Sequence, residues 1–452
     1  NRENKMLIDV TLLVKNPEII KGLLDGSMKR YGSVIRWAAG TAKAGQIVRH
    51  LAETPGLTSK LMTVPFSPIE AGIDVIGHGL TYHKLIGVDH KLIGIDSKLI
   101  GIDSKLIGID SKLIGFEKTL SSVMGLSQIA AGASVLNLGI SIAGFAYMGS
   151  KLHQVQKTLG HIQQSMEEGF NRVEAGLNRI DNRLDIISEQ LAYLYLLVED
   201  SRQKQKSLAK AISHLHQAML IKEIAALKAE LDERSRFPDE SPRSAIKTAS
   251  SVGLFLSNQA MQATPELDAE IMLNADVSIQ GWAVALATEA NLLLEIGKHQ
   301  EAKELLALQI PLFKQVAERW GKALINDENT YLSTAYRFTN SRFKNHITSE
   351  RVERITEISP SDRTLSPDQI RGKKNYVDVE FEMSYSSAKF DQTWTHRQIA
   401  VAEYLDGLSE LSARLEGLES FANLCESRGV KSSREILPGA DTEPGIYILP
   451  ST

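Results

Sequence analysis

The sequence predicts a mainly α-helical protein, in which long heptad-repeat helices and one membrane-type helix join a small N-terminal α+β domain to a C-terminal helical domain. Three observations lead to this fold class. Residues 83–118 hold five near-copies of a seven-residue unit. They run into Thr119–Ser150, 32 residues without Asp, Glu, Lys, Arg or His. A second heptad series extends from Leu152 to Val198, and alternating spacings of three and four indicate helices that pack on other helices.

Residues 1–62 predict the small α+β domain. Met6–Val14 has the composition of a strand. Asn16–Asp25 follows as a short helix that an Asn caps and a Pro opens. Lys29–Ala39 and Gln46–Ala52 are expected to be two further strands.

The Gly-rich stretch Gly40–Gly45 lies between these two strands. It lacks the Gly-Lys-Ser/Thr ending of a phosphate-binding loop, so it predicts a turn. Residues 63–82 contain several Pro and Gly and are expected to form a linker and a short helix that lead into the repeat.

Residues 83–118 predict an oligomerisation segment. In the middle copies of the unit Leu occupies position a, Ile position d, Asp position e and Lys position g, a pattern that favours three or four parallel helices over two. Gly at position c costs about 1 kcal/mol relative to Ala, so the repeat needs partners or a membrane to hold it as a helix. A helix lying in the membrane interface is the alternative. The predicted oligomer seam is Leu92, Ile95, Leu99, Ile102, Leu106, Ile109, Leu113 and Phe116.

Residues 119–150 predict a transmembrane or membrane-inserting helix, because about 20 apolar residues suffice to span a bilayer. Continuing the seam into this stretch gives a line of small and polar residues with large apolar residues on the neighbouring positions. In a parallel bundle such a line faces inward and borders a water-filled path. Close packing of membrane helices without a pore, or a helix buried in a soluble core, are the alternatives. The predicted pore-lining residues are Ser127, Ser134, Asn137 and Ser141.

The second half of the chain predicts more helix. Residues 151–234 read as a coiled coil, residues 235–244 as a linker with two Pro, residues 245–436 as a helical domain and residues 437–452 as an extended tail.

Within that helical domain, Ala285–Ile296, the turn Gly297-Lys298-His299 and a second helix opened by Glu301 resemble one tetratricopeptide-type helix pair, which implies a repeat that stacks on neighbours.

Further predictions for the helical domain follow from composition and periodicity. Pro311–Arg342 and Thr395–Arg428 are expected to be amphipathic helices, the latter closed by a Gly, and Pro360–Lys374 to be irregular. Tyr376–Tyr385 alternates apolar and polar residues, which fits a strand or the start of a helix.

Composition and motifs exclude several function classes. The net charge of −4 and pI of about 6.3 give no basis for bulk nucleic-acid binding. Cys425 is the single cysteine, so no intramolecular disulfide forms. None of the HExxH, GxSxG and GxGxxG motifs is present, and His83 and His90 stand where later copies have Ser. We therefore expect no enzyme activity, no catalytic or metal-ligating residues and no cofactor.

These features together predict a membrane-inserting, parallel homo-oligomer, a trimer or tetramer, that forms a pore or ion channel gated by its soluble domains. The expected partners are the lipid bilayer, further copies of the chain and a regulatory protein or small ligand on a soluble domain. The layout resembles that of membrane-disrupting effectors of bacterial toxin and anti-phage systems, which implies a bacterial inner membrane with cytoplasmic domains.

Two other functions fit the same sequence. One is a non-conducting coiled-coil scaffold that binds a partner through its C-terminal helices. The other is a soluble α-helical pore-forming toxin that hides its uncharged helix until it meets a membrane. A soluble cytoplasmic location is the matching alternative.

Overall fold

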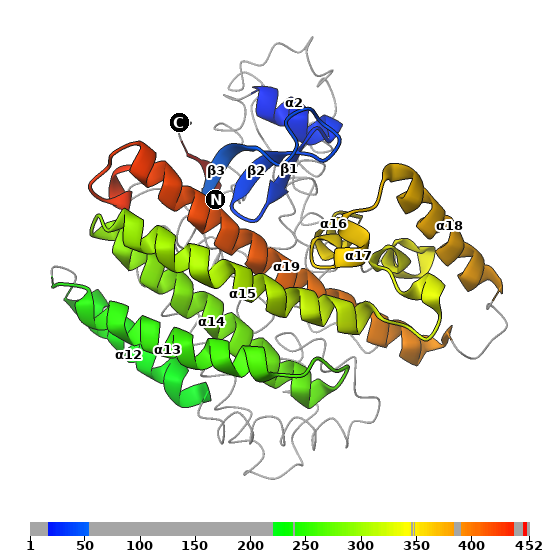
Figure 1. Ribbon diagram of the computed structural model, residues 1–452, viewed down its shortest axis with the longest axis horizontal. Coiled ribbons are helices and arrows are strands. Elements are labelled where there is room, and N and C mark those ends of the chain that lie inside the picture. Colours follow the sequence, from blue (N-terminus) through cyan, green and yellow to red (C-terminus); the bar gives the residue numbers. More distant parts are fainter. Residues whose placement is uncertain are drawn as a thin grey trace, which may run out of the picture.

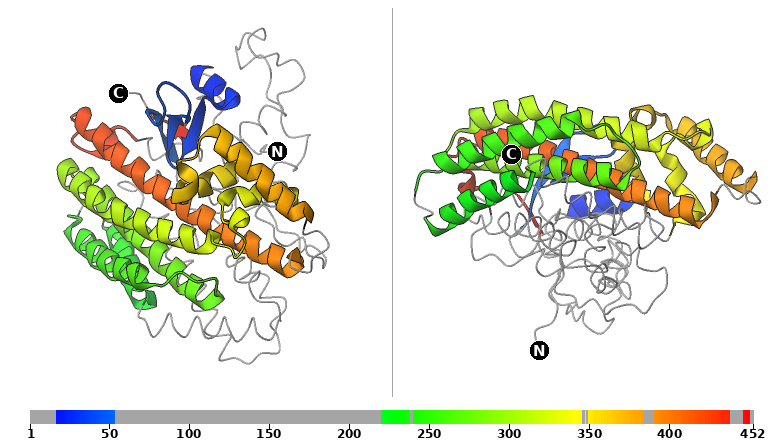
Figure 2. Two further views of the ribbon diagram at one scale, coloured as in Figure 1. Left: turned by 45° about the vertical axis from the view of Figure 1, so that its right-hand side comes forward. Right: turned by 90° about the horizontal axis from the view of Figure 1, so that it is seen from below.

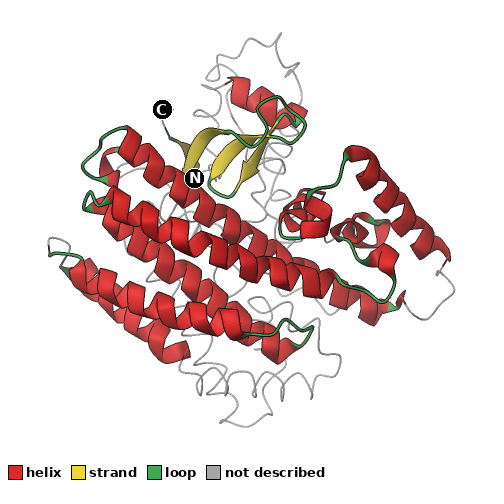
Figure 3. Ribbon diagram, viewed as in Figure 1, coloured by secondary structure: helices red, strands yellow, loops and turns green. Residues whose placement is uncertain are grey.

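The computed structural model describes residues 17–53, 220–237, 240–344, 347, 349–383, 390–437 and 446–449. This part of the chain is mostly helical with one small antiparallel sheet, as predicted (Figures 1 and 3). The predicted strand Met6–Val14, the heptad repeat 83–118, the uncharged stretch 119–150 and the coiled coil up to residue 219 lie outside the described residues.

Four strands form the sheet in the order β1-β2-β3-β4, all antiparallel. The N-terminal segment supplies β1 (Met28–Tyr31), β2 (Val34–Trp37) and β3 (Ile47–Glu53), preceded by helix α2 (Pro17–Asp25). The expected extended tail supplies β4 (Ile446–Ile448) at the other end of the chain. The prediction of one strand over Lys29–Ala39 was wrong, because this stretch turns back on itself to make both β1 and β2.

Gly32 decides that turn. Its backbone has a φ of +57°, which Gly adopts without strain, and the two-residue loop Gly32–Ser33 joins Tyr31 to its partner Val34. A Cβ at Gly32 would lie 2.5 Å from the carbonyl of Ala413, and one at Gly417 would lie 2.0 Å from Ser33 Oγ. The hairpin therefore rests directly on the backbone of a C-terminal helix.

Strand β3 is divided between two partners. Ile47–His50 aligns with β2, whereas the last three residues, Leu51–Glu53, align with β4. The Leu51 amide donates to the Ser33 carbonyl at 2.7 Å, and the Leu449 amide donates to the His50 carbonyl at 2.9 Å. Strand β3, which ends at Glu53 just before residue 54, thus lies between β2 and β4 in the sheet.

The helical body consists of α12 (Leu220–Arg236), α13 (Arg243–Gln262), α14 (Ala269–Glu295), α15 (His299–Ile325) and α19 (Gln392–Ser427). These helices lie roughly side by side as one slab, with the sheet against α19 (Figures 1 and 2). Helix α14 contacts all four others and buries residues around most of its circumference, which explains its apolar sequence.

Length and hydropathy mark α14, over Glu270–Glu295, as long and apolar enough to cross a membrane, and it is the one such helix in the described part of the chain. Over its most apolar stretch 94% of the helix is buried. Asp276 and Gln280 are buried with them and bond to each other at 2.7 Å. These properties are those of the central helix of a folded core.

A smaller lobe holds 3₁₀ turns η1 (Thr330–Leu332), η2 (Ala335–Thr339) and η3 (Ser341–Phe343), then α16 (Ser349–Glu357), α17 (Pro360–Arg363) and α18 (Pro367–Met383). A further turn, η5 (Ser433–Glu435), follows α19. The prediction of helix over Pro311–Arg342 was wrong beyond Ile325. The side chain of Arg337 folds back and donates to the carbonyls of Leu324 and Ile325 at 3.0 and 2.6 Å, which ends α15.

One other expectation for this lobe was wrong. Pro360–Lys374 is not irregular, since it forms α17 and the first half of α18. For Tyr376–Tyr385 the sequence left a strand and the start of a helix both open, and the described residues of this stretch are helical and end α18. Val377 and Phe381, four residues apart, face the core, while Val379 between them is 49% exposed.

One hydrophobic cluster joins the sheet to the helical body. Ala52, the second-last residue of β3, Leu220, the first residue of α12, and Leu449, next to β4, all belong to it and are each at most 3% exposed. The described residues on either side of residues 54–219 are therefore buried in the same core.

Candidate functional site

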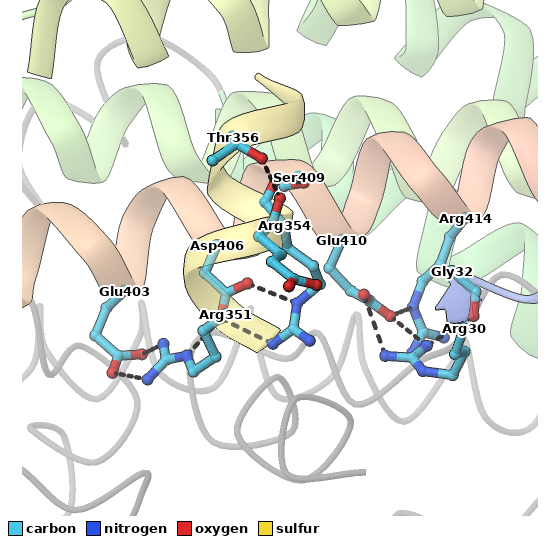
Figure 4. Close-up of polar contacts among 11 residues, drawn as sticks. Arg30, Gly32, Arg351, Arg354, Thr356, Glu403, Asp406, Ser409, Glu410 and Arg414 are labelled. Atoms are coloured by element: carbon cyan, nitrogen blue, oxygen red, sulfur yellow. Dashed lines mark hydrogen bonds and ion pairs between the residues drawn. The ribbon is translucent and has the colours of Figure 1, made fainter. Parts of the chain in front are cut away.

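A line of charged residues on α19 is the most polar feature in the described interior. Glu403, Asp406, Glu410 and Arg414 follow one another at spacings of three, four and four, which places them on one face of the helix. All four are largely buried, and Asp406 has no exposed side-chain surface. We call these residues and the arginines that they bind the α19 charge line (Figure 4).

The first half of the α19 charge line ties α16 to α19. Arg351 makes two contacts with Glu403, at 2.8 and 2.7 Å, and its Nε donates to Asp406 at 2.5 Å. Arg354 Nε donates to the second oxygen of Asp406 at 2.8 Å. Burial alone would lower the pKa of Arg351, but the carboxylates of Glu403 and Asp406 outweigh it and raise this pKa above its usual value. The Arg351 guanidinium therefore stays charged.

The second half ties β1 to α19. Arg30 reaches Glu410 at 2.8 and 3.3 Å and also donates to the Gly32 carbonyl at 2.7 Å, while Arg414 donates to Glu410 at 2.7 Å. Burial would raise the pKa of Glu410, but the two guanidinium groups outweigh it and hold this pKa far below its usual range. One carboxylate thus locks the turn of the β1–β2 hairpin to the helix beneath it.

Asp362, in the smaller lobe, is likewise a buried carboxylate whose oxygens all accept hydrogen bonds from protein donors. One of its oxygens accepts from Thr334 Oγ1 and Lys373 Nζ at 2.8 and 2.9 Å, and the other from Ser359 Oγ and the Ala335 amide, both at 2.7 Å. A carboxylate with four donors has no free lone pair to offer a metal or a substrate. Across the described ranges, no group of three or more His, Cys, Asp or Glu side chains is placed to hold a metal ion.

His50 and Ser420 form the one contact of a catalytic type in the described residues. His50 Nε2 lies 2.8 Å from Ser420 Oγ, and the ring packs edge-on against Phe421. Burial lowers the pKa of His50 to about 4. No described carboxylate bonds to the second ring nitrogen, so the pair lacks the group that orients the base in a Ser-His-Asp arrangement. Its evident role is to hold β3 on α19.

Acid should weaken this attachment of β3. A buried His with a pKa of about 4 stays neutral in the folded chain, whereas the unfolded chain takes up a proton near pH 6.5. Stability is therefore complete above pH 6.5 and falls as the pH drops toward 4, by about 2–3 kcal/mol for this group. Four glutamates whose pKa values burial raises act in the opposite direction: Glu289, Glu295, Glu357 and Glu419.

The His50→Gln variant isolates the contribution of His50 from that of these carboxyl groups. We expect urea unfolding of this variant to show a flatter loss of stability between pH 6.5 and 4 than the unchanged chain. The comparison at pH 7.5, where His50 is neutral in both states, corrects for the change in side-chain shape. Identical pH slopes for the two chains would contradict the prediction.

None of the residues predicted for the oligomer seam or the pore lining belongs to the α19 charge line. Every predicted seam and pore-lining residue lies outside the described residues, so the structure does not test their grouping. The α19 charge line was missed, although its signal is present in the sequence. Three carboxylates and an arginine share one face of a 36-residue helix.

Comparison with known proteins gave no match: no family model, no curated protein and no solved structure resembles this chain.

Proposed function

We propose that this chain is a membrane-inserting homo-oligomer, in which residues 54–219 carry self-association and insertion and the folded body regulates them. The observation that carries the proposal is the shared core. Ala52 and Leu220 flank that segment and are buried in the same hydrophobic cluster. The predicted heptad repeat 83–118 and the uncharged stretch 119–150 therefore belong to one excursion, residues 54–219, that leaves a single folded body and returns to it.

The folded body supports a regulatory role because its interior is occupied by contacts between its own elements. The α19 charge line joins segments that are far apart in sequence, and Arg234 and Arg434 both reach Glu295 at the end of α14. Removing one partner of a buried pair leaves an uncompensated charge and costs about 3–5 kcal/mol, so these contacts hold the elements in their observed arrangement. Such a body is suited to one well-defined arrangement that holds both ends of the excursion in place.

The shared core also constrains how the excursion meets a bilayer. A chain that begins and ends at one body crosses a membrane an even number of times, or enters and leaves through the same face. One span takes about 20 residues, so Thr119–Ser150 has the length for one crossing and not for two. The proposal therefore includes either a second crossing within residues 54–219 or a segment that dips into the bilayer and returns.

The proposed pore lining is tested by making its polar stripe apolar. We expect Ser134→Leu combined with Asn137→Leu to lower conductance across planar bilayers about tenfold, because water and ions lose their polar partners along the path. The measurement is single-channel or bulk ion flux, together with the mass of the oligomer in detergent.

Ala143→Leu is the matched control, since it adds similar volume on the opposite face of the same predicted helix. It should leave flux unchanged. Equal flux through the control and the double variant would contradict a pore lined by this stripe. A chain that oligomerises and binds membranes but never conducts would favour the alternative function, a non-conducting scaffold.

A further inference from the structure

The end of β3, directly before residues 54–219, pairs with β4, the last strand in the described part of the chain. Leu51, Ala52 and Glu53 pair with Ile448, Tyr447 and Ile446, whereas β2 aligns only with the earlier half of β3. Figure 2 shows this short C-terminal strand beside the N-terminal strands. The three residues that precede the excursion are thus aligned in the sheet by β4.

The attachment of β4 is small but specific. It comprises three paired residues and the buried side chain of Leu449, whose amide donates to the His50 carbonyl. A strand of this length contributes few hydrogen bonds to offset the entropy of ordering it. It is therefore the part of the sheet that separates at the lowest cost, while the hairpin stays locked by Arg30 and Glu410.

We propose that β4 is a releasable strap that restrains the excursion, so that its displacement triggers membrane insertion of residues 54–219. This inference rests on the proposed function. With β4 in place, β3 is extended up to Glu53 and the excursion starts from a fixed position and direction. Without β4, Ala52 and Glu53 lose their partner strand and become free to move away with the segment that follows, while the Leu51 amide stays bonded to the Ser33 carbonyl.

Backbone alternation in β3 provides an internal control for the first measurement. The Leu51 amide donates to Ser33, on the β2 side of the strand, and the His50 carbonyl accepts from Leu449 on the other side. Successive amides of a strand point in opposite directions, so the Ala52 amide faces β4. Hydrogen exchange at Ala52 therefore reports on the strap, while exchange at Leu51 reports on the hairpin.

Two forms of the full chain test the strap, one lacking residues 438–452 and one carrying Tyr447→Pro. Proline at 447 removes an amide that faces β3, whereas Ile448→Pro, the matched control, removes one that faces away. We expect exchange at Ala52 to rise about tenfold or more in both test forms, with Leu51 unchanged. Dye release from vesicles of phosphatidylethanolamine and phosphatidylglycerol should speed up in parallel.

The outcomes separate the strap from the proposed function. Unchanged exchange at Ala52 in both test forms overturns the strap, and so does faster exchange with dye release equal to that of the intact chain. If none of the chains releases dye and all of them are monomeric, the proposed function itself is overturned. The exchange data then still report whether β4 protects the Ala52 amide of β3. Faster exchange and faster release together support both.

Discussion

Asp406→Asn should destabilise the folded body by about 3–5 kcal/mol, the largest loss expected from any single side chain described here. Asp406 is fully buried and binds two guanidinium groups, Arg351 at 2.5 Å and Arg354 at 2.8 Å. Asn keeps the shape but carries no charge, so Arg351 and Arg354 both lose the buried carboxylate that they share. The measurement is the urea midpoint and slope, followed by circular dichroism.

Asp368→Asn is the control for this prediction. Asp368 is 89% exposed and pairs only with Arg371 on the same helix, so its loss should change stability by less than about 0.5 kcal/mol. If charge is the cause of the Asp406 effect, adding Arg354→Met to Asp406→Asn should recover part of the loss. A midpoint for Asp406→Asn that matches the Asp368 control would show that the charge line does not stabilise the fold.

Cysteines placed at Lys43 and Lys222 should always react from the same side of a membrane. Both positions are exposed, Lys43 in the β2–β3 loop and Lys222 near the start of α12. The body that carries them is one core, so inserted protein exposes both sites or hides both. The experiment treats sealed vesicles with a membrane-impermeant maleimide, before and after detergent is added. In sealed vesicles we expect either both cysteines or neither to be labelled.

Cys425 serves as the internal control, since it is 0% exposed and should react only after denaturation. Resistance to carbonate extraction establishes that the labelled protein is inserted. Labelling of one site with protection of the other would show an odd number of crossings, and that result would overturn the arrangement argued from the shared core.

The sequence predicted local structure well where one factor dominated. Helix α2 begins at Pro17 as its first-turn proline indicates, and α19 ends just before Gly429, whose φ of +61° suits a helix terminus. The sequence left the local structure open where packing competed with pattern. The alternation around Val379 resembles a strand, but the core accepts only Val377 and Phe381, which lie on one face of a helix.

The functional features divide in the same way. Periodicity predicts self-association of residues 83–118, and the lack of charge predicts membrane insertion of residues 119–150. Both stay predictions. The charged spacing on α19 is visible in the sequence, but its partners are not. Arg30 meets Glu410 across 380 positions, and no local pattern reports a contact of that range.

The sequence by itself determined where helices form and which stretches are apolar or uncharged, because capping, periodicity and composition act over a few residues. Only the tertiary structure decided that β3 and β4, from opposite ends of the chain, share a sheet, and that residues 54–219 begin and end in one core. The physical reason is that burial and charge pairing depend on which surfaces meet, and that is set by the folded chain as a whole.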